Sequence, residues 1–349
     1  MAFPAHATSL GDASPHHRHP TLRSQVVAEI DVEELEVRYG PTVAVDRLSL
    51  QAHAGAVLVL LGPNGAGKTS TVEAMEGYRV PASGRVRVLG LDPRRDHRAL
   101  SARIGVMLQR GGIYPTMPAG EALGLFAKYY PAPAEPIALL DRVGLTAAAR
   151  TPWRRLSGGE QQRLSLALAM VGQPEVVFLD EPTAGVDPEG RLAIRAIVAE
   201  LRDRGVCVVL TTHELDEAER LADRIVIVDR GRVVAEGSPA ALMTGFGGDH
   251  IRFGAPPGID ASAMAGAVGA AVGGQAAVTA REDRPGEYVV DVPPTPQAVA
   301  ALTAWLAERD LPLADLRAGR ERLEDVFLRL TRSGARPDAD APAARRGRR

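Results

Sequence analysis

Short runs of consecutive apolar residues alternate with longer amphipathic stretches over the first two thirds of the chain. Residues 57–61 (Val-Leu-Val-Leu-Leu) form one such run, which ends at a glycine. An apolar run of this length predicts a strand buried on both faces, as the strands of parallel sheets are. Because such runs alternate with helical periodicity, the pattern predicts an α/β core with a largely parallel sheet. The other apolar runs lie at 176–179, 206–210 and 225–228, and the clearest helical stretches at 159–170 and 191–203.

The pattern changes at the glycine-rich residues 245–249, and a second, smaller α/β domain is predicted beyond them. Its expected strands lie near Ile251, Ala277, Tyr288 and Leu313, and its expected helices near Ala261, over 297–308 and over 323–330. The last helix is amphipathic, and we interpret it as packing on this domain. We therefore divide the chain into a disordered leader (1–30), a main domain (31–246), a small C-terminal domain (250–331) and a disordered tail (332–349).

Composition narrows the classes of function. The 349 residues are 45% hydrophobic and 24% charged, with a net charge of −2, so no nucleic-acid partner is expected. The single cysteine, Cys207, lies in an apolar run and cannot form an internal disulfide, which fits a reducing compartment. The leader lacks the pattern of a secretory signal, and the uncharged stretch 261–280 is too weakly hydrophobic to span a membrane. Any membrane function is therefore assigned to another polypeptide.

Both ends of the chain leave alternatives open. The cluster His16-His17-Arg-His19 could bind a metal, although no acidic residue or cysteine surrounds it, and a disordered leader is favoured. The terminal Arg-Arg-Gly-Arg-Arg could contact anionic lipid, although a solvated terminus is favoured.

Residues 62–69 (Gly-Pro-Asn-Gly-Ala-Gly-Lys-Thr) match a phosphate-binding loop, and they stand between a predicted strand and a helix as that motif requires. Backbone N–H groups of the glycine-rich turn cradle phosphates, and the helix N-terminus adds positive charge. Lys68 is expected to reach the β- and γ-phosphates, and Thr69 to offer its hydroxyl to Mg²⁺. The alternative is a glycine-rich turn with a chance lysine. The ATP-binding residues predicted here are Gly62, Pro63, Asn64, Gly65, Ala66, Gly67, Lys68, Thr69 and Ser70.

Two adjacent carboxylates, Asp180 and Glu181, follow the apolar run at 176–179. Beside a phosphate loop, Asp180 is expected to hold Mg²⁺ through water, and Glu181 to orient and polarise the attacking water. The alternative is that both carboxylates cap the segment that begins at Pro182.

The segment 156–163 contains Ser157, Gly158, Gly159 and Glu160 just before a predicted helix. Exposed N–H groups, a hydroxyl and a helix dipole together make a second phosphate site. Since the chain already has one cradle, we interpret this segment as closing on the γ-phosphate held by a second copy, in a head-to-tail dimer. An ordinary serine helix cap is the alternative, and it explains Ser157 but not the rest of the string.

With these motifs in place, residues 31–246 resemble the ATP-binding cassette (ABC) family, whose signature corresponds to 156–160. The resemblance implies a P-loop NTPase core with a mostly parallel sheet, an antiparallel β subdomain and a helical signature subdomain. It also implies roles for single residues. Gln109 corresponds to the Q-loop, which touches Mg²⁺ and senses the membrane partner; Asp187 to the D-loop across the dimer; His213 to the switch histidine at the γ-phosphate; and Tyr39 to the aromatic that stacks on adenine.

Residues 323–331 resemble the ending of ATPases that serve ABC-2 type exporters, including daunorubicin-resistance-like drug exporters. The resemblance implies an ATP-hydrolysing subunit that energises a separate transmembrane permease from the cytoplasmic face of the membrane. Residues 114–121 depart from many relatives, which have Leu-Thr before the helix; the change is expected to affect partner choice rather than ATP chemistry. The rivals are ABC factors of translation or DNA repair and a non-ABC P-loop kinase or motor. The translation factors carry two cassettes, whereas this chain has one. The repair proteins insert a long coiled coil between the phosphate loop and the signature, whereas only about 90 residues without a heptad run separate Lys68 from Ser157. A non-ABC kinase or motor would leave residues 156–163 without a role.

Overall fold

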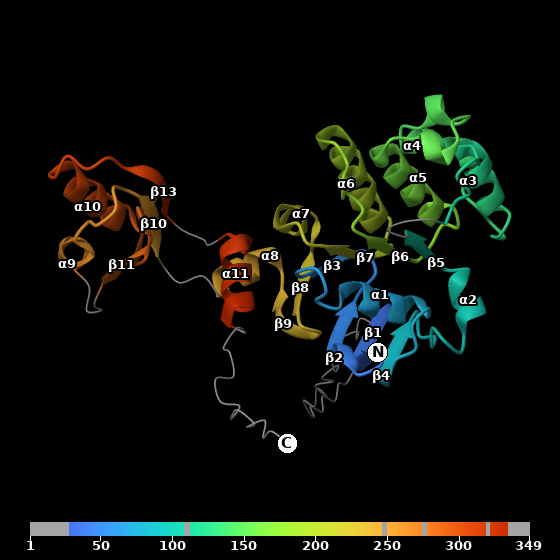
Figure 1. Ribbon diagram of the computed structural model, residues 1–349, viewed down its shortest axis with the longest axis horizontal. Coiled ribbons are helices and arrows are strands. Elements are labelled where there is room, and N and C mark those ends of the chain that lie inside the picture. The colour runs from blue at the N-terminus through green and yellow to red at the C-terminus, as the bar shows by residue number, and fades with distance from the viewer. Residues whose placement is uncertain (1–27, 108–111, 246–249, 274–277, 319–321, 334–349) are drawn as a thin grey trace, which may run out of the picture.

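The computed structural model describes residues 28–107, 112–245, 250–273, 278–318 and 322–333. The leader before residue 28, the tail after residue 333 and Gln109 therefore lie outside the described residues. Three sheets organise the rest: a central sheet of six strands, an antiparallel sheet of three, and a C-terminal sheet of four (Figure 1).

The central sheet has the order β5-β6-β7-β3-β8-β9, and its strands are parallel except β9, which runs antiparallel to β8. This arrangement confirms the predicted α/β core. The strands are β3 (Val57–Leu61), β5 (Ile104–Met107), β6 (Val176–Asp180), β7 (Cys207–Thr212), β8 (Arg224–Asp229) and β9 (Arg232–Gly237).

Helices cover both faces of this sheet, which explains why its strands read as unbroken apolar runs. In β3, Val57 and Val59 belong to the core on one face, together with α5 (Gly158–Met170) and α6 (Pro188–Asp203). Leu58 and Leu60 belong to the core on the other face. There they pack in the same cluster as the buried side of α1 (Lys68–Glu76). The phosphate-loop helix α1 and the signature helix α5 thus lie on opposite faces of one sheet.

Two smaller units complete the main domain. The antiparallel sheet has the order β2-β1-β4, from β1 (Ile30–Tyr39), β2 (Thr42–Ala52) and β4 (Ser83–Val88), and its inner face shares a core with α1. The helical unit around α5 lies beyond the other face of the central sheet (Figure 1). It contains α3 (Ala119–Ala127), α4 (Pro136–Arg142), η1 (Thr146–Ala148) and η2 (Trp153–Arg155), while α2 (His97–Ser101) precedes β5.

The C-terminal domain has its own core, in which two helices cover one face of an antiparallel sheet of order β11-β12-β10-β13. This chain order, strand-helix-strand-strand-helix-strand, is that of a ferredoxin-like unit. The predicted alternation of strands and helices is confirmed. The elements are β10 (Ile251–Gly254), α9 (Ala261–Val272), β11 (Thr279–Arg284), β12 (Glu287–Asp291), α10 (Pro296–Ala307) and β13 (Ala314–Ala318).

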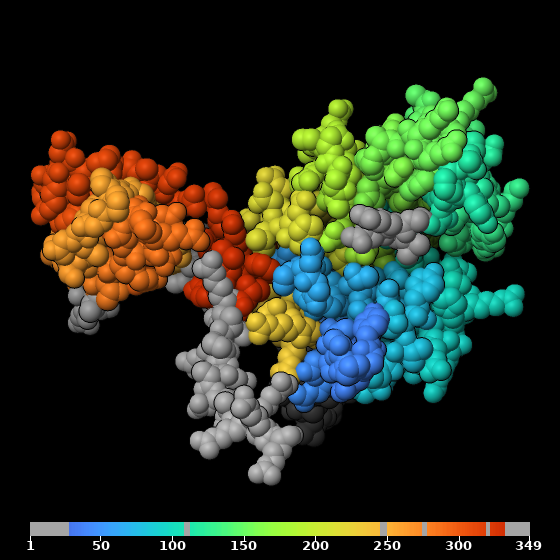
Figure 2. All heavy atoms as spheres, in the orientation of Figure 1, coloured from blue at the N-terminus to red at the C-terminus, as the bar shows by residue number. Residues whose placement is uncertain are grey.

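The final helix, α11 (Leu323–Ser333), differs from expectation because it packs on the main domain. Leu323 is fully buried in the core that contains α5 and α6, and Phe327 and Leu330 pack against the same core. Its neighbours are α7 (Leu215–Leu221) and α8 (Pro239–Gly245). Figure 2 shows that α11 lies in the narrow region between the C-terminal domain and the rest of the molecule.

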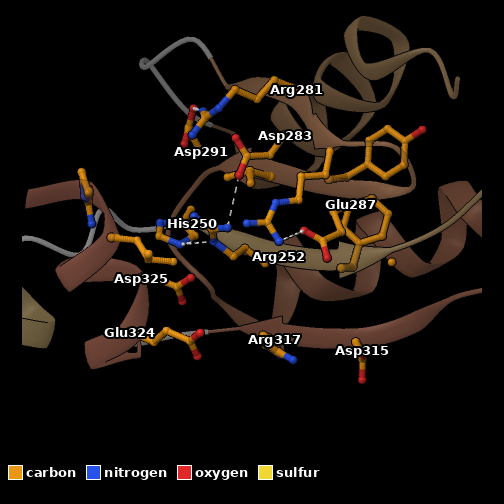
Figure 3. Close-up of a pocket in the computed structure, with 17 residues that line it drawn as sticks. His250, Arg252, Arg281, Asp283, Glu287, Asp291, Asp315, Arg317, Glu324 and Asp325 are labelled. Atoms are coloured by element: carbon orange, nitrogen blue, oxygen red, sulfur yellow. Dashed lines mark hydrogen bonds and ion pairs between the residues drawn. The ribbon is translucent and has the colours of Figure 1, made fainter. Parts of the chain in front are cut away.

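The charged outer face of the C-terminal sheet explains why the hydrophobic side of α11 does not pack there. Arg252, Arg281 and Arg317 lie on this face, around a hollow of about 490 Å³ that also borders α11 (Figure 3). Ion pairs cover this face: Arg281 Nη1 lies 2.7 Å from Asp291 Oδ2, and Arg252 Nη1 lies 3.6 Å from Asp283 Oδ2. Such a surface offers no apolar partner for the hydrophobic side of α11.

In the part of the chain that the structure describes, no helix combines the length and the apolar character needed to cross a bilayer.

Candidate functional site

The predicted phosphate loop connects β3 to α1, as expected. Gly65 and Gly67 have φ angles of 81° and 102°, which only glycine adopts readily. A Cβ on Gly67 would also lie 2.5 Å from the carbonyl oxygen of Ala44. The loop therefore depends on glycine both for its curvature and for its close contact with β2.

Lys68 is the first residue of α1, and its side chain folds back into the loop. The Lys68 Nζ donates to the carbonyl oxygens of Gly62, at 2.7 Å, and Pro63, at 3.1 Å. Burial lowers the pKa of Lys68, while the carboxylates of Glu181 and Asp180 favour its charged form. The ammonium is therefore fixed inside the curve of the loop, with two carboxylates nearby.

Asp180 and Glu181 stand where β6 ends, next to the end of β7. Asp180 Oδ1 accepts a hydrogen bond from the Thr211 hydroxyl, and burial raises the pKa of Asp180. Glu181 has a φ of 48°, a left-handed conformation that costs energy in a residue with a side chain. The Glu181 N–H donates to the carbonyl of Thr211 at 3.1 Å and to its hydroxyl oxygen at 3.2 Å. Thr211 thus holds both carboxylate residues in place.

His213 follows β7 directly, and its Nδ1 lies 2.9 Å from Glu181 Oε1. The two residues meet because β6 and β7 are neighbouring parallel strands, with Asp180 opposite Thr211. The His213 side chain is 46% exposed and that of Glu181 only 14%. This places a partly shielded carboxylate beside an imidazole that faces solvent, an arrangement suited to orienting a water molecule.

A hollow of about 350 Å³ lies beside α1, where Thr69 and Asp180 line it together. Glu73 and Glu76 of α1 line the same hollow, along with Val72, Tyr78 and Met107. Glu76 is only 5% exposed, and burial raises its pKa to about 8, with smaller contributions from Asp180 and Glu73. Sequence reasoning missed Glu76, because its burial depends on strands that follow it in the chain.

Tyr39, at the end of β1, lies next to the phosphate loop. Its hydroxyl is 3.1 Å from Ser70 Oγ, and the Arg79 guanidinium stands 4.5 Å over its ring. Arg79 in turn pairs with Glu73 at 3.1 Å. One face of the aromatic ring therefore has a cation against it, a contact that sequence reasoning did not predict.

Ser157 is the N-cap of α5 and forms a reciprocal capping box with Glu160. The Glu160 N–H donates to Ser157 Oγ at 3.3 Å, and Glu160 Oε2 accepts from the Ser157 N–H at 2.7 Å. The hydrogen bonds that the Ser157 N–H and hydroxyl donate to the Glu160 carboxylate lower the pKa of Glu160. The helix-cap interpretation of Ser157 is thus confirmed, and it leaves the Gly158-Gly159 backbone at the helix N-terminus.

Asp187 is the N-cap of α6, where its side chain accepts from the Gly190 N–H at 3.4 Å. A Cβ on Gly159 would lie 3.3 Å from Asp187 Oδ1, so the signature segment and the Asp187 loop are neighbours within one chain. The predicted site residues that the structure describes thus fall into two main groups. One is the phosphate loop with Asp180, Glu181 and His213, and the other is the pair of helix N-termini at Ser157 and Asp187.

The comparisons with known proteins agree with this arrangement. A protein-family model with the description "ABC transporter" matches residues 45–184. A daunorubicin resistance ATP-binding protein of Streptomyces coeruleorubidus is 38% identical over 311 residues, which cover 86% of this chain and 95% of that protein. The chain belongs to the ABC transporter family. A Nod factor export ATP-binding protein I of Paraburkholderia xenovorans is similar to this ABC protein, with 36% identity over 316 residues, 87% of this chain and 97% of the relative.

A solved structure of the ATP-binding subunit of an ABC transporter matches with a TM-score of 0.58 and 25% identity, over 62% of this chain and 93% of that one. This ABC protein is thus an ATP-binding subunit with the ATPase activity of its family, which confirms the predicted family, fold class and enzyme class and excludes a non-ABC kinase or motor. The matches to the two relatives are 311 and 316 residues long, which is more than the 246 residues from the start of the chain to the end of the main domain. They therefore extend into the C-terminal domain.

The substitution Glu76→Gln is expected to stabilise the fold at alkaline pH. The pKa of Glu76 is about 8 in the folded chain, against 4.5 as its ordinary value. The folded state therefore binds more protons between these values, and the free energy of unfolding falls as the pH rises through that window. Glutamine keeps the shape without the charge, so the variant should be the more stable form at about pH 9 and differ little at about pH 4.

Urea unfolding of both proteins across this pH range measures the difference. Glu33→Gln, at an exposed carboxylate of β1, is the control and should leave the pH dependence unchanged. A stability difference that is the same at every pH would contradict the raised pKa.

Proposed function

We propose that two copies of this chain bind two ATP molecules at a shared interface, each between residues 62–69 of one copy and residues 157–160 of the other. The observation that carries the proposal is the separation of the two phosphate-binding segments within one chain. One segment opens α1 on one face of the central sheet, and the other opens α5 on the opposite face. A helix N-terminus with free N–H groups binds anions, so the second segment can also bind a phosphate. Because the phosphate loop of the same chain lies on the other face of the sheet, that phosphate would be one held by a partner copy.

Within each site the residues divide the work. The N–H groups of Gly62, Asn64, Gly65, Ala66, Gly67, Thr69 and Ser70 surround the phosphates, while Pro63, which has no N–H, only shapes the loop. Tyr39 stacks on the adenine with its remaining face. Lys68 neutralises the β- and γ-phosphates, a role that requires its ammonium to exchange loop carbonyls for phosphate oxygens. Glu181 polarises the attacking water, and His213 holds Glu181 through Nδ1 while its other nitrogen faces the γ-phosphate.

Thr69 and Asp180 are the residues that would hold Mg²⁺. Their oxygen atoms line one hollow, and Mg²⁺ prefers oxygen ligands. Burial raises the pKa of Asp180, and a cation at this point would favour the ionised carboxylate. The family resemblance adds Gln109. When bound, Mg²⁺ neutralises charge that develops on the phosphates.

The substitution Glu181→Gln is expected to trap a dimer with ATP bound. Removing the general base lowers the turnover of ATP by about 100-fold or more, while the phosphate loop still binds the nucleotide. Size-exclusion chromatography with ATP and Mg²⁺ should show a dimer that persists, and a phosphate-release assay measures turnover. The matched control is Glu175→Gln, which lies just before the opposite end of β6 and pairs with Arg103 outside the site. Turnover at the native rate in Glu181→Gln would show that Glu181 is not the base.

A mixing experiment tests the sharing of sites between copies. Gly158→Asp places a carboxylate where the γ-phosphate would bind, without strain, because Gly158 lacks a positive φ and a Cβ there has ample room. An acidic residue also favours a helix N-terminus, so the fold should be retained. Lys68→Ala disables the phosphate loop. Each variant alone should lack activity, and their mixture should regain part of it, because one of the two sites in a mixed dimer combines native segments. A mixture as inactive as its components would contradict the shared site.

We further propose that this ABC ATPase energises a separate permease for export, at the cytoplasmic face of the membrane. The relatives that support this are named for daunorubicin resistance and for Nod factor export, and the chain covers 95% and 97% of their lengths. Their matches extend into the C-terminal domain, so the similarity is not confined to the ATP-binding core that ABC proteins share in general. Because cargo contacts belong to the permease, this chain leaves the cargo open.

Coexpression with a neighbouring membrane protein tests the permease. If that protein contains about six apolar spans of about 20 residues each, the chain should move from the soluble to the membrane fraction and copurify with it in detergent. Expression of the chain alone is the control for non-specific sedimentation. A chain that stays soluble beside every such candidate would favour a soluble ABC factor instead.

A further inference from the structure

Two arginines one turn apart on α6 connect this helix to α7, the helix that follows His213. Arg191 and Glu214 form a bidentate pair, with Nη1–Oε2 at 2.6 Å and Nη2–Oε1 at 3.1 Å. Arg195 lies 3.6 Å from Glu217 Oε1, through its Nε. Glu214 is the N-cap of α7 and directly follows His213, so the first pair fixes the backbone next to the histidine.

Arg191 makes a third contact, and this one reaches the loop before α6. Its Nε donates to the carbonyl oxygen of Val186 at 3.0 Å. Val186 directly precedes Asp187, the N-cap of α6 that lies beside the signature glycine Gly159. One planar guanidinium thus joins the residue before Asp187 to the residue after His213.

The second pair differs in character and acts as an anchor. Glu217 is fully buried, and its other oxygen accepts a hydrogen bond from the hydroxyl of Thr183. Burial raises the pKa of Glu217, and Arg195 opposes that rise. Glu217 thus fixes α7 to α6 through Arg195, and to the segment after Glu181 through Thr183. Arg191 and Glu214, by contrast, are about one third exposed. They lie between the Asp187 loop and the segment after β7, so the contact that joins these two segments is not fully buried.

We propose that Arg191 is a positioning residue that couples the Asp187 loop to His213, so that hydrolysis waits for the second copy to engage that loop. The inference rests on the proposed ATP-bound dimer. The donors of a guanidinium have a fixed planar geometry, so Val186 and Glu214 keep one spacing while both are bound. A shift of the Asp187 loop on dimer closure therefore moves the backbone at Glu214, and with it the imidazole that holds Glu181.

The test compares Arg191→Ala, Arg191→Lys and Glu214→Gln in the full-length chain. In each variant kcat for ATP hydrolysis should fall about tenfold or more, since a misplacement of about 1 Å near the reacting groups costs up to about 100-fold. KM for ATP and the binding of a fluorescent ATP analogue should change by less than about twofold, because the phosphate loop is untouched. Lysine keeps the charge but lacks the planar fork, so Arg191→Lys should resemble Arg191→Ala.

Two controls separate positioning from folding. Arg204→Ala removes an exposed arginine just after α6, paired with Glu200 at 2.6 Å, and should leave kcat unchanged. The double variant Arg191→Ala/Glu214→Gln should be no slower than the slower single variant, as expected when two residues act through one contact. Native kcat in Arg191→Ala, full rescue by lysine, or strictly additive losses would each overturn the proposal.

A variant background distinguishes this inference from the proposed function. In Glu181→Gln, the added Arg191→Ala should still permit the ATP-dependent dimer, because the coupling acts on hydrolysis after closure. If Glu181→Gln alone forms no dimer with ATP, the proposed shared site fails, whatever Arg191 does. If that dimer forms and Arg191→Ala prevents it, Arg191 supports assembly rather than hydrolysis, and the coupling proposal is wrong.

Discussion

The parallel pairing of β3, β6 and β7 is the constraint on which the site depends. Because parallel strands end at the same edge of a sheet, the segments that leave them converge there. Leu61 is opposite Thr212, and Asp180 is opposite Thr211. This register brings together a loop that starts at Gly62, carboxylates at 180 and 181, and His213. A slip of one residue in either pairing would move one of these groups away from the others and turn its side chain to the other face.

The charges collected at this edge explain several local features. Lys68, Asp180 and Glu76 are all partly removed from water. Burial lowers the pKa of Lys68 and raises the pKa of Asp180 and of Glu76, so in each case it favours the neutral form. The protein offsets the cost for Lys68 with loop carbonyls and for Asp180 with the Thr211 hydroxyl. A polyphosphate with its cation would complement this set of groups. The left-handed backbone at Glu181 belongs to the same edge, where the Glu181 N–H donates to both the carbonyl and the hydroxyl oxygen of Thr211.

The two faces of the central sheet separate tasks that the proposed dimer recombines. The face of α1 carries the phosphate loop, and the opposite face carries α5 and α6, whose N-termini at Ser157 and Asp187 are neighbours. Arg191 connects this second group to the segment after β7 within the same chain. Helix α11 also packs on the α5 and α6 side, which joins the C-terminal domain to the face that carries the signature.

The sequence by itself determined the features that rest on local periodicity and local hydrogen bonding. Unbroken apolar runs predicted the strands buried on both faces. The glycine spacing before Lys68 predicted the loop between β3 and α1, and Ser157 predicted the start of α5. The elements of the C-terminal domain followed from the same patterns. Each depends on residues within a few positions of one another, so the chain encodes it without reference to distant segments.

Only the tertiary structure decided the contacts between residues far apart in the chain. The burial of Glu76, the cation over the ring of Tyr39, the pair Arg191–Glu214 and the packing of α11 on the main domain all belong to this class. An arginine or an amphipathic helix has the same local pattern whichever partner it meets. The partner is selected by strand register and by which surface remains apolar, and both arise only when the sheets have assembled.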